Sequence, residues 1–503
     1  MARWILRIFA AFAVLCAAGL GACFLLPERF AVNVPLRNAL LGSPGAAPAP
    51  GLLGSRIRVP EGLSIGLFAE LPRVRALRPT PAGDLLASVP REGKVVLLER
   101  DGDGDGRSDG ARTLLEGLNR PHGMDLHDGW LYVAETDAVG RVRFDPAARR
   151  ASGAFERVVT GLPSGGNHWT RTIRFGSDGW LYVSVGSSCN VCVEDDQRRA
   201  ALLRFRPDGS GGETYATGLR NAVGFDWRPD TGELYATDNG RDLLGDDYPP
   251  CELNRVVKGG FYGWPFANGA RDPDPDLGEG HEAEIATSIP PAHAFRAHNA
   301  PLGIVFLQRD LAPGLARGTA LVALHGSWNR TRKDGYEVVS LHFGPDGGIE
   351  ERDFVSGFLL EDEVVGRPVD VAEGADGAVY VSDDYAGAVY RIAAAGAAAA
   401  QAAGAPEDTR GAADPLAGIP EAERTASNAR GAALYEAHTC FRCHEAARAE
   451  SGVVAVPLAK LRERYDVAAL AALLAAPTPP MPMYPFSDAE RRELAIHLLA
   501  GPR

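Results

Sequence analysis

Two cysteines and a histidine near the C-terminus have the spacing of a covalent haem site. Cys440, Cys443 and His444 form a Cys-x-x-Cys-His sequence, in which the thiols can bond the haem vinyl groups and the imidazole can bind the iron. A zinc site is the alternative, but it needs four ligands, and no cysteine follows Cys443. The spacing therefore predicts haem c and electron transfer.

Flanking patterns predict a small helical domain around this motif. A helix is expected over 424–438, and Ser487 with Glu490 forms a capping box that opens a final helix. Between them, Met481 and Met483 lie in a proline-rich loop, and a thioether is the usual sixth ligand of an electron-transfer haem. The domain resembles class I cytochromes c, where the ligand commonly opens a Met-Pro stretch, which favours Met481 over Met483.

The N-terminus and the composition bear on the compartment. The 503-residue chain has a net charge of −13, which argues against nucleic acid and anionic membrane surfaces as partners. Arg3 and Arg7 precede an apolar run over 8–26 that predicts an export signal or a membrane anchor. Residues 20–23 also look like a bacterial lipobox, in which Cys23 would carry a lipid. These interpretations stay open, and both predict a periplasmic protein.

A strand pattern recurs six times between residues 55 and 395. A turn, often Asp-Gly, precedes an apolar strand, as in Trp130-Leu131-Tyr132-Val133 and Val379-Tyr380-Val381. Such repeats predict an all-β six-bladed propeller, with a β-sandwich array as the alternative. The expected organisation is a signal peptide or anchor over 1–26, a linker over 27–54, the propeller over 55–395, an Ala/Gly/Pro-rich linker over 396–423 and a small all-α cytochrome c domain over 424–503.

Polar residues gather in five loops beside the repeat strands, at 166–171, 218–221, 237–247, 325–330 and 366–368. Loops at one end of a propeller channel form its functional face. Arginines from several blades suit a ligand with several carboxylates. Aspartate and carbonyl oxygens suit Ca²⁺, and a histidine suits a general base.

At these loops the chain resembles the glucose/sorbosone dehydrogenase family, and within it the L-sorbosone dehydrogenase-like branch. The resemblance is carried by Gly-Asn-His-Trp-Thr-Arg at 166–171, Gly-Leu-Arg-Asn at 218–221 and the stretch from 237 to Gly-Trp-Pro at 263–265. That family binds pyrroloquinoline quinone (PQQ) and Ca²⁺ on a six-bladed propeller. The resemblance implies the same fold and cofactors here.

The resemblance also assigns roles to individual residues. It implies that His168 is the catalytic base and that Arg220 contacts the quinone and stabilises a developing oxyanion. The remaining assignments are quinone contacts from Asn221, Asn239 and Asp247, weaker quinone contacts from Arg330 and Arg367, and Ca²⁺ ligation by the backbone carbonyls of Gly240 and Arg241. A family lysine has no clear match, and Gln308 falls near its place in the sequence. Residues 248–251 are additional, so the substrate stays open.

The expected function is PQQ-dependent oxidation of a sugar, aldose or related alcohol or aldehyde. Electrons would pass from the reduced quinone to the chain's own haem, and then to a downstream cytochrome or terminal oxidase. Two alternatives remain: a metal-dependent hydrolase of the lactonase type, and a non-catalytic propeller that docks a partner while the haem relays electrons.

Two further patterns carry local predictions. Asp101, Asp103 and Asp105 alternate with glycine like the front half of a calcium loop, so either a structural Ca²⁺ or a solvated acidic turn is expected. Cys189 and Cys192 form Cys-Asn-Val-Cys, which in an exported protein favours a small disulfide loop over a redox site.

Overall fold

The computed structural model describes residues 31–33, 50–395, 415–416, 419–445, 448, 458, 461–475, 484 and 486–500. The chain divides into two compact units, residues 1–405 and 406–503. The predicted leader with Cys23, most of both predicted linkers, and Met481 lie outside the described residues. Within the described part, no helix has the length and apolar character needed to cross a membrane.

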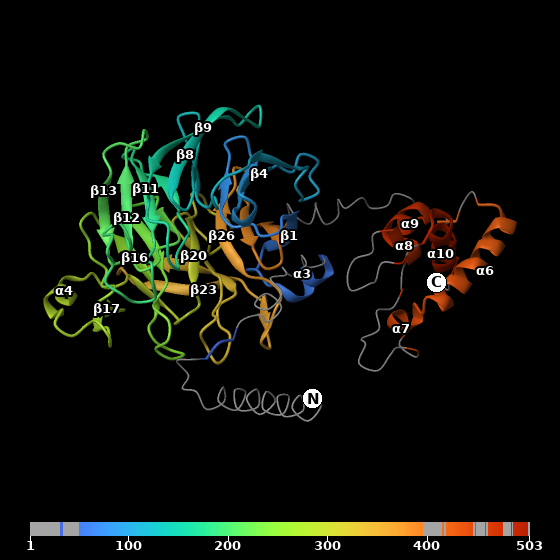
Figure 1. The fold of residues 1–503 in the computed structure, drawn as a ribbon. Coiled ribbons are helices and arrows are strands. Elements are labelled where there is room, and N and C mark those ends of the chain that lie inside the picture. The colour runs from blue at the N-terminus through green and yellow to red at the C-terminus, as the bar shows by residue number, and fades with distance from the viewer. Residues whose placement is uncertain are drawn as a thin grey trace, which may run out of the picture. The chain divides into compact units, whose positions relative to one another are not determined.

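Six four-stranded antiparallel sheets form the first unit and confirm the six-bladed propeller (Figure 1). The first three blades are β2 (Leu77–Pro79), β3 (Leu85–Val89), β4 (Lys94–Leu98) and β5 (Ala111–Leu115); β6 (Met124–His127), β7 (Trp130–Ala134), β8 (Ala138–Asp145) and β9 (Arg150–Thr160); and β10 (Ile173–Phe175), β11 (Leu181–Val185), β12 (Ala201–Phe205) and β13 (Glu213–Thr217).

The other three blades complete the ring. They are β14 (Phe225–Trp227), β15 (Leu234–Asp238), β16 (Cys251–Val256) and β19 (His293–Phe295); β20 (Pro301–Phe306), β21 (Ala320–Leu324), β22 (Glu337–Phe343) and β23 (Ile349–Val355); and β26 (Pro368–Glu373), β27 (Val379–Asp383), β28 (Ala388–Ala394) and β1 (Leu63–Glu70). Shorter elements are α3 (Pro50–Arg56), η2 (Pro90–Glu92), α4 (Glu282–Thr287), β17 (Ala267–Asn268), β18 (Asp272–Pro273), β24 (Leu359–Leu360) and β25 (Glu363–Val364).

The six repeats seen in the sequence are the second strands of the six blades. All residues of β3, β11, β15, β21 and β27 are buried, because apolar clusters fill the space between adjacent blades. One such cluster joins Tyr132 and Val139 to Ile173 and Leu181 of the next blade. Burial on both faces explains why these strands are nearly all apolar.

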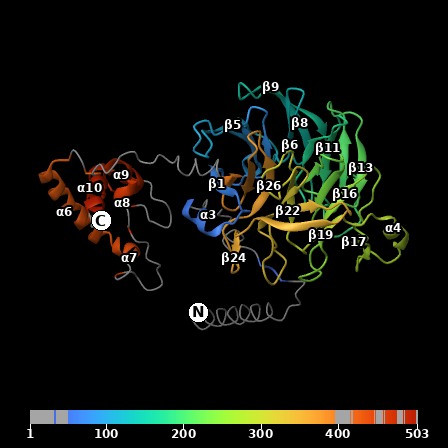
Figure 2. The same ribbon diagram turned by 180° about the vertical axis from the view of Figure 1, so that it is seen from behind.

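The last blade closes the ring with a strand from the opposite end of the sequence. β1 pairs with β28 from Leu63 opposite Ala394 to Glu70 opposite Ala388. This pairing ties the start of the propeller to its last blade and so closes the ring. The outer strand of this blade therefore precedes the other blades in the sequence, and its three inner strands follow them (Figure 2).

Strand direction decides which loops meet. Neighbouring strands are antiparallel, so loops that lead into each first strand lie at the same end as loops that join the second and third strands. Asn239, just after β15, shows this arrangement: its side chain donates to the carbonyl of Pro301, the first residue of β20, at 3.1 Å. We call this end of the propeller the mouth.

The second unit is helical, with α6 (Glu421–Ala437), α7 (Phe441–His444), α8 (Leu461–Arg464), α9 (Val467–Ala475) and α10 (Asp488–Ala500). α10 packs on α6 and α9 (Figure 2). Gly431 permits this approach, since a Cβ there would lie 2.3 Å from the carbonyl oxygen of Glu493. The Ser487–Glu490 capping box is confirmed by reciprocal hydrogen bonds of 2.8 and 3.3 Å.

Candidate functional site at the propeller mouth

All five polar loops identified in the sequence lie at the mouth. The loops at 166–171, 218–221 and 366–368 lead into the first strands β10, β14 and β26. The loops at 237–247 and 325–330 follow the second strands β15 and β21. The propeller topology thus gathers residues that are up to 200 positions apart in sequence around one opening, as antiparallel blades require.

His168 is fixed at the mouth through Ser187. Its Nδ1 lies 3.0 Å from Ser187 O and 2.9 Å from Ser187 Oγ. The Ser187 hydroxyl donates its own proton to Cys189 O at 2.7 Å. Both Ser187 oxygens are therefore acceptors for Nδ1–H, which leaves the lone pair of the ring on Nε2.

The electrostatic surroundings keep this imidazole neutral. Burial, followed by the positive charge of Arg220, lowers the pKa of His168 to about 3. Gly186 brings a second predicted site residue close, because a Cβ on it would lie 2.6 Å from His168 Cβ and 2.7 Å from Asn221 Oδ1. His168 and Asn221 thus converge over Gly186, and a neutral imidazole can accept a proton there.

Arg220 is 4% exposed and holds together three segments of the mouth. Its Nη1 donates to the carbonyl oxygens of Asn239 and Gly240, both at 3.0 Å. Its Nε donates to Asn190 O at 2.9 Å, and its Nη2 donates to Asn190 Oδ1 at 2.9 Å and to Asp242 Oδ2 at 3.2 Å. The guanidinium therefore lies at the centre of the site.

Two carboxylates flank this arginine, the buried Asp238 and the partly buried Asp242. Asp238 accepts the backbone N–H of Asn221 at 2.6 Å, and burial raises the pKa of Asp238 to about 7. Asp242 behaves in the opposite way: although burial favours its neutral form, hydrogen bonding to His298 and the charge of Arg220 lower its pKa. At neutral pH, Asp242 is therefore the carboxylate that balances the charge of Arg220.

The carbonyls of Gly240 and Arg241 are the predicted calcium ligands, and Gly240 O accepts a hydrogen bond from Arg220, as does Asn239 O. The side chain of Arg241 is buried and forms a bidentate pair with Asp274 at 2.7 Å. The Asn239 side chain fixes the loop by donating to Asn221 O at 3.2 Å.

The remaining predicted quinone contacts are engaged with neighbours at the mouth. Arg330 pairs with Asp247 at 3.1 Å, and the Asp247 side chain is 91% exposed. Arg367 donates to His325 O at 3.2 Å and to His325 Nδ1 at 3.0 Å. His325 in turn bonds Asp384 at 3.0 Å. These two arginines form their hydrogen bonds with other residues than those that bond Arg220.

Two other features singled out in the sequence, the 101–109 turn and Gln308, lie at the end of the propeller opposite the mouth. The 101–109 turn joins β4 to β5, and the carboxylates that gather there are Asp101, Asp103 and Asp109. Asp105, which was predicted to belong there, is not in that group, and its carboxylate accepts the backbone N–H of Arg107. Gln308 follows the far end of β20, so it cannot replace a cofactor-contacting lysine at the mouth.

Comparison with known proteins identifies the propeller. The model of the family described as glucose / sorbosone dehydrogenase matches residues 130–391. The chain belongs to the glucose/sorbosone dehydrogenase family. A pyrroloquinoline quinone-dependent pyranose dehydrogenase of Coprinopsis cinerea is 26% identical over 381 residues, covering 60% of this chain and 51% of that protein. An uncharacterized protein of Borreliella burgdorferi is 31% identical over 295 residues, covering 56% of this chain and 77% of that protein.

Solved structures of the family show the same fold. The holo form of the PQQ domain of the C. cinerea pyranose dehydrogenase superposes with a TM-score of 0.58 at 22% identity, covering 67% of this chain and 97% of that one. A calcium structure of a Trichoderma reesei family AA12 carbohydrate-active enzyme gives a TM-score of 0.60 at 21% identity, with the same coverage. This chain spans about half the length of the curated pyranose dehydrogenase.

Three residues that were not predicted from the sequence connect the candidate site residues. Asn190, Ser187 and His298 each bond a predicted site residue or its neighbour. Asn190 had a signal, because it lies between the two cysteines of the predicted disulfide loop. Ser187 and His298 lie outside the motifs that carried the family resemblance.

The predicted haem residues belong to the second unit. Cys440 immediately precedes α7 and His444 ends it, and the backbone N–H of His444 donates to Cys440 O at 3.2 Å. Cys440 and His444 therefore lie one helical turn apart. The side chain of Cys443 and the whole of Met481 lie outside the described part of the chain.

Proposed function

We propose that the protein is a periplasmic PQQ-dependent sugar dehydrogenase that passes electrons to its own haem c. Membership in the glucose/sorbosone dehydrogenase family and the similarity to a PQQ-dependent pyranose dehydrogenase support the propeller part of this proposal. The Cys-x-x-Cys-His sequence supports the haem part. The expected partners are a sugar or alcohol substrate and a downstream cytochrome or terminal oxidase.

The observation that carries the proposal is the tautomer of His168. A base that removes a hydroxyl proton needs a neutral nitrogen with a free lone pair. Ser187 fixes the proton on Nδ1, and burial together with Arg220 keeps the ring neutral. Nε2 of His168 can therefore accept the hydroxyl proton of a sugar at the mouth.

The donor set at the mouth fits PQQ, a planar quinone with three carboxylates. Arg220, Arg330 and Arg367 supply positive charge there. Cationic guanidinium groups are strong hydrogen-bond partners of carboxylates.

The backbone carbonyl oxygens of Gly240 and Arg241 would hold Ca²⁺, since neutral carbonyl oxygens are among the ligands that Ca²⁺ prefers. Gly240 O accepts a hydrogen bond from Arg220 Nη1 at 3.0 Å, which places this carbonyl at the mouth. When bound, PQQ with Ca²⁺ supplies the oxidant that takes two electrons from the substrate. The five N–H groups of Arg220 bond Asn190, Asn239, Gly240 and Asp242, so Arg220 would favour negative charge on the substrate oxygen through its positive charge and not by a direct hydrogen bond.

One feature of the second unit supports the proposal of a covalently attached haem. Cys440 and His444 lie at the two ends of a single helical turn, which is compatible with one thioether bond and one axial iron ligand on the same haem. Cys443 would form the other thioether bond, and Met481 would be the second axial ligand. When bound, the haem supplies a one-electron acceptor for the propeller.

The periplasmic location is proposed from two independent features. Cys189 and Cys192 form a disulfide, and disulfides persist in oxidising compartments. The apolar run over 8–26 supports export, with attachment to the inner membrane by a helix or by a lipid on Cys23. Haem attachment to the Cys-x-x-Cys-His sequence is expected in the same compartment.

The hydrolase alternative has weaker support. A hydrolase of the lactonase type needs a metal held by side chains at the mouth. Among the described residues, the groups of three side chains able to hold a metal are Cys189, Cys192 and Glu194, whose sulfurs are joined as a disulfide, and Asp101, Asp103 and Asp109 at the opposite end. Neither group is a set of free ligands around His168.

The test uses the purified full-length chain, produced with haem attached and loaded with PQQ and Ca²⁺. A panel of aldoses and polyols is added, and reduction of the haem is followed by its absorbance, alongside reduction of an artificial dye. Chain without PQQ is the control. Sugar-dependent reduction of both haem and dye supports the whole proposal. If only the dye is reduced, the haem part of the proposal is wrong. If neither haem nor dye is reduced, the dehydrogenase part is wrong.

A further inference from the structure

We propose that Asn190 is a positioning residue for Arg220, and that the Cys189–Cys192 disulfide holds Asn190 in place. Reduction of this disulfide would then release Arg220 and disable the site. The consequence for turnover rests on the proposed dehydrogenase function. The positioning itself concerns contacts within the chain and can be tested without cofactor.

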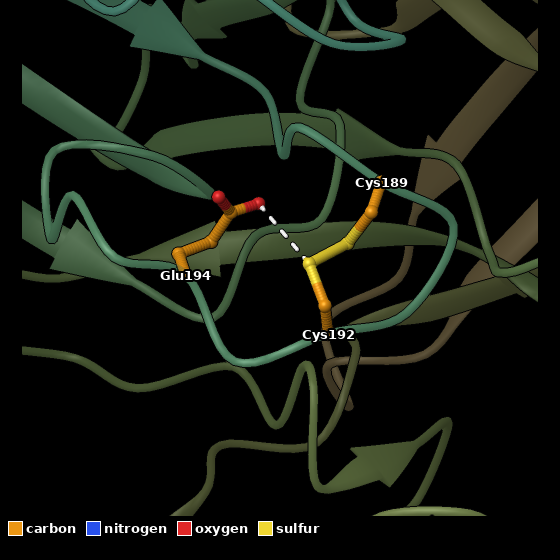
Figure 3. A group of neighbouring side chains, drawn as sticks. All are labelled: Cys189, Cys192 and Glu194. Carbon is orange, nitrogen blue, oxygen red and sulfur yellow. Dashed lines mark hydrogen bonds between the residues drawn. A yellow bond between two sulfur atoms is a disulfide. The ribbon is translucent and has the colours of Figure 1, made fainter.

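The disulfide encloses Asn190 in a very small ring. Cys189 and Cys192 are joined with a sequence separation of 3, so that only Asn190 and Val191 lie between them. The ring is part of the loop after β11 at the mouth (Figure 3). A ring of this size restricts the backbone of the enclosed residues far more than an open loop would.

Asn190 uses both its backbone and its side chain on the catalytic loops. Its backbone carbonyl accepts Nε of Arg220, and its Oδ1 accepts Nη2 of Arg220, both at 2.9 Å. Oδ1 also accepts the backbone N–H of Asp242 at 2.8 Å, and Nδ2 donates to Asp242 O at 3.0 Å. Asn190 therefore fixes Arg220 and its counter-charge Asp242 together.

Further contacts join the ring to the base. Trp264 Nε1 donates to the same Asn190 carbonyl at 3.3 Å. The carbonyl of Cys189 accepts the Ser187 hydroxyl, whose oxygen contacts His168. The ring thus supports Arg220 on one side and His168 on the other, although these two residues come from different blades.

Glu194 has a contact with the disulfide that reduction would change. Its carboxylate accepts the backbone N–H and the hydroxyl of Ser188 at 2.6 and 2.8 Å. It also lies 3.9 Å from Cys192 Sγ, as the dashed line in Figure 3 shows. A disulfide sulfur has no proton to donate, whereas a Cys192 thiol would have one for Glu194.

Chemical reduction can be separated from global unfolding. A phosphine and one water cleave the S–S bond, giving two thiols and the phosphine oxide, so the two electrons come from phosphorus and the two thiol protons come from water. A disulfide that closes so short a loop contributes less to global stability than one that closes a long loop. The propeller is therefore expected to stay folded while the loop relaxes.

The first experiment measures the exposure of Arg220 in the full-length chain without PQQ. An arginine-selective dicarbonyl reagent is applied, and labelling is quantified by peptide mass spectrometry. Arg220 should be protected in the oxidised chain and should label about tenfold faster after phosphine treatment or in Asn190→Ala, because the charged hydrogen bonds from Asn190 would no longer hold the guanidinium. Arg204 on β12, whose side chain is 12% exposed and pairs with Asp178 and Glu213, is the internal reference for unfolding.

Matched variants decide between local and general effects. Val193→Ala changes an exposed side chain on the same loop and should leave labelling as in the parent. The double variant Cys189→Ala/Cys192→Ala should match the phosphine-treated chain, which covers the case of a disulfide that resists the reagent. Unchanged Arg220 labelling in both Asn190→Ala and the double variant would overturn the proposal, as would equal increases at Arg220 and Arg204.

The second experiment links positioning to turnover in the PQQ- and Ca²⁺-loaded chain with a dye acceptor. Asn190→Ala should lower kcat by about tenfold or more, with the KM for sugar changed by less than about twofold, because Arg220 acts on charge that develops in the transition state. A parent chain without activity removes the proposed function but leaves the labelling result standing. Normal kcat with exposed Arg220 would show that Arg220, and hence Asn190, is not needed for turnover.

Discussion

His168 Nδ1 lies 2.9 Å from Ser187 Oγ, while the Ser187 hydroxyl proton is directed at Cys189 O. This chain of two hydrogen bonds has one consistent direction, in which the imidazole donates to serine and serine donates to the carbonyl. The base and its lone pair are therefore oriented by a serine and not by a carboxylate. Ser187 therefore orients the imidazole but adds no negative charge beside it.

The first prediction concerns this base. His168→Ala should keep the fold and quinone binding but lower turnover by at least about a hundredfold, the lower range for loss of a general base. Turnover with a dye acceptor is measured in PQQ-loaded protein whose melting temperature matches the parent. His342→Ala, on β22 and outside the mouth, is the control. Near-normal turnover of the His168 variant would contradict the assignment of His168 as the catalytic base.

The second prediction concerns a buried carboxylate pair beside Arg220. Glu252 lies opposite Asp238 in the β15–β16 pairing, and burial followed by repulsion from Asp238 raises the pKa of Glu252 to about 8. The folded protein therefore keeps a proton that the unfolded chain releases above about pH 4.5. The contribution of Glu252 to the free energy of unfolding is therefore highest below pH 4.5, and it is lost as the pH rises through about 8.

Glu252→Gln should remove that loss. The melting temperature of the parent should fall by several degrees between about pH 5 and about pH 9, and that of the variant should fall less. Asn254 supports the substitution, because it donates to Glu252 Oε2 while its own buried Oδ1 has no partner among the described residues, and a glutamine amide can donate to it. Glu350→Gln, at an exposed carboxylate, is the control. Parallel curves for parent and Glu252→Gln would contradict the pKa assignment.

The parts of the fold that the sequence predicts are those determined locally. Each second strand follows a turn and is apolar, so Trp130–Ala134 and Val379–Asp383 were recognisable one unit at a time. The capping box at Ser487 is likewise complete within four residues. The helix expected over 424–438 begins at Glu421, three residues early, because no capping side chain marks its start.

Features that depend on long-range packing were not predictable in the same way. The pairing of β1 with β28 joins residues more than 300 positions apart, and no local pattern encodes it. Asp109, in place of the predicted Asp105, joins Asp101 and Asp103 because of how the turn folds back. The position of Gln308 at the end opposite the mouth follows from the direction of β20. The mouth residues were found by motif, whereas the Asn190–Arg220 contact required the arrangement of two blades.

The third prediction concerns the axial ligand of the proposed haem. Met481→Ala should lower the haem potential and abolish any sulfur-to-iron absorption band, because a thioether ligand raises the potential. Met483→Ala is the matched control and should change neither property. Redox titration and absorbance of the oxidised protein measure both effects. The reverse pattern would assign the ligand to Met483, and silence of both variants would exclude a methionine ligand in this loop.

The fourth prediction concerns the predicted linker over 396–423. Cutting the chain near residue 410 should leave a propeller that oxidises sugar with an artificial dye at the rate of the intact chain, because all mouth residues precede the cut. Transfer to haem should fall steeply on dilution of the equimolar fragments, since a covalent connection sets an effective concentration near the millimolar range for short flexible linkers. The intact chain, assayed at the same dilutions, should show a haem reduction rate per molecule that does not depend on concentration. Equal rates for cut and intact chain at high dilution would mean that the fragments bind each other tightly or that electrons take another route, and the linker would then have no role in transfer.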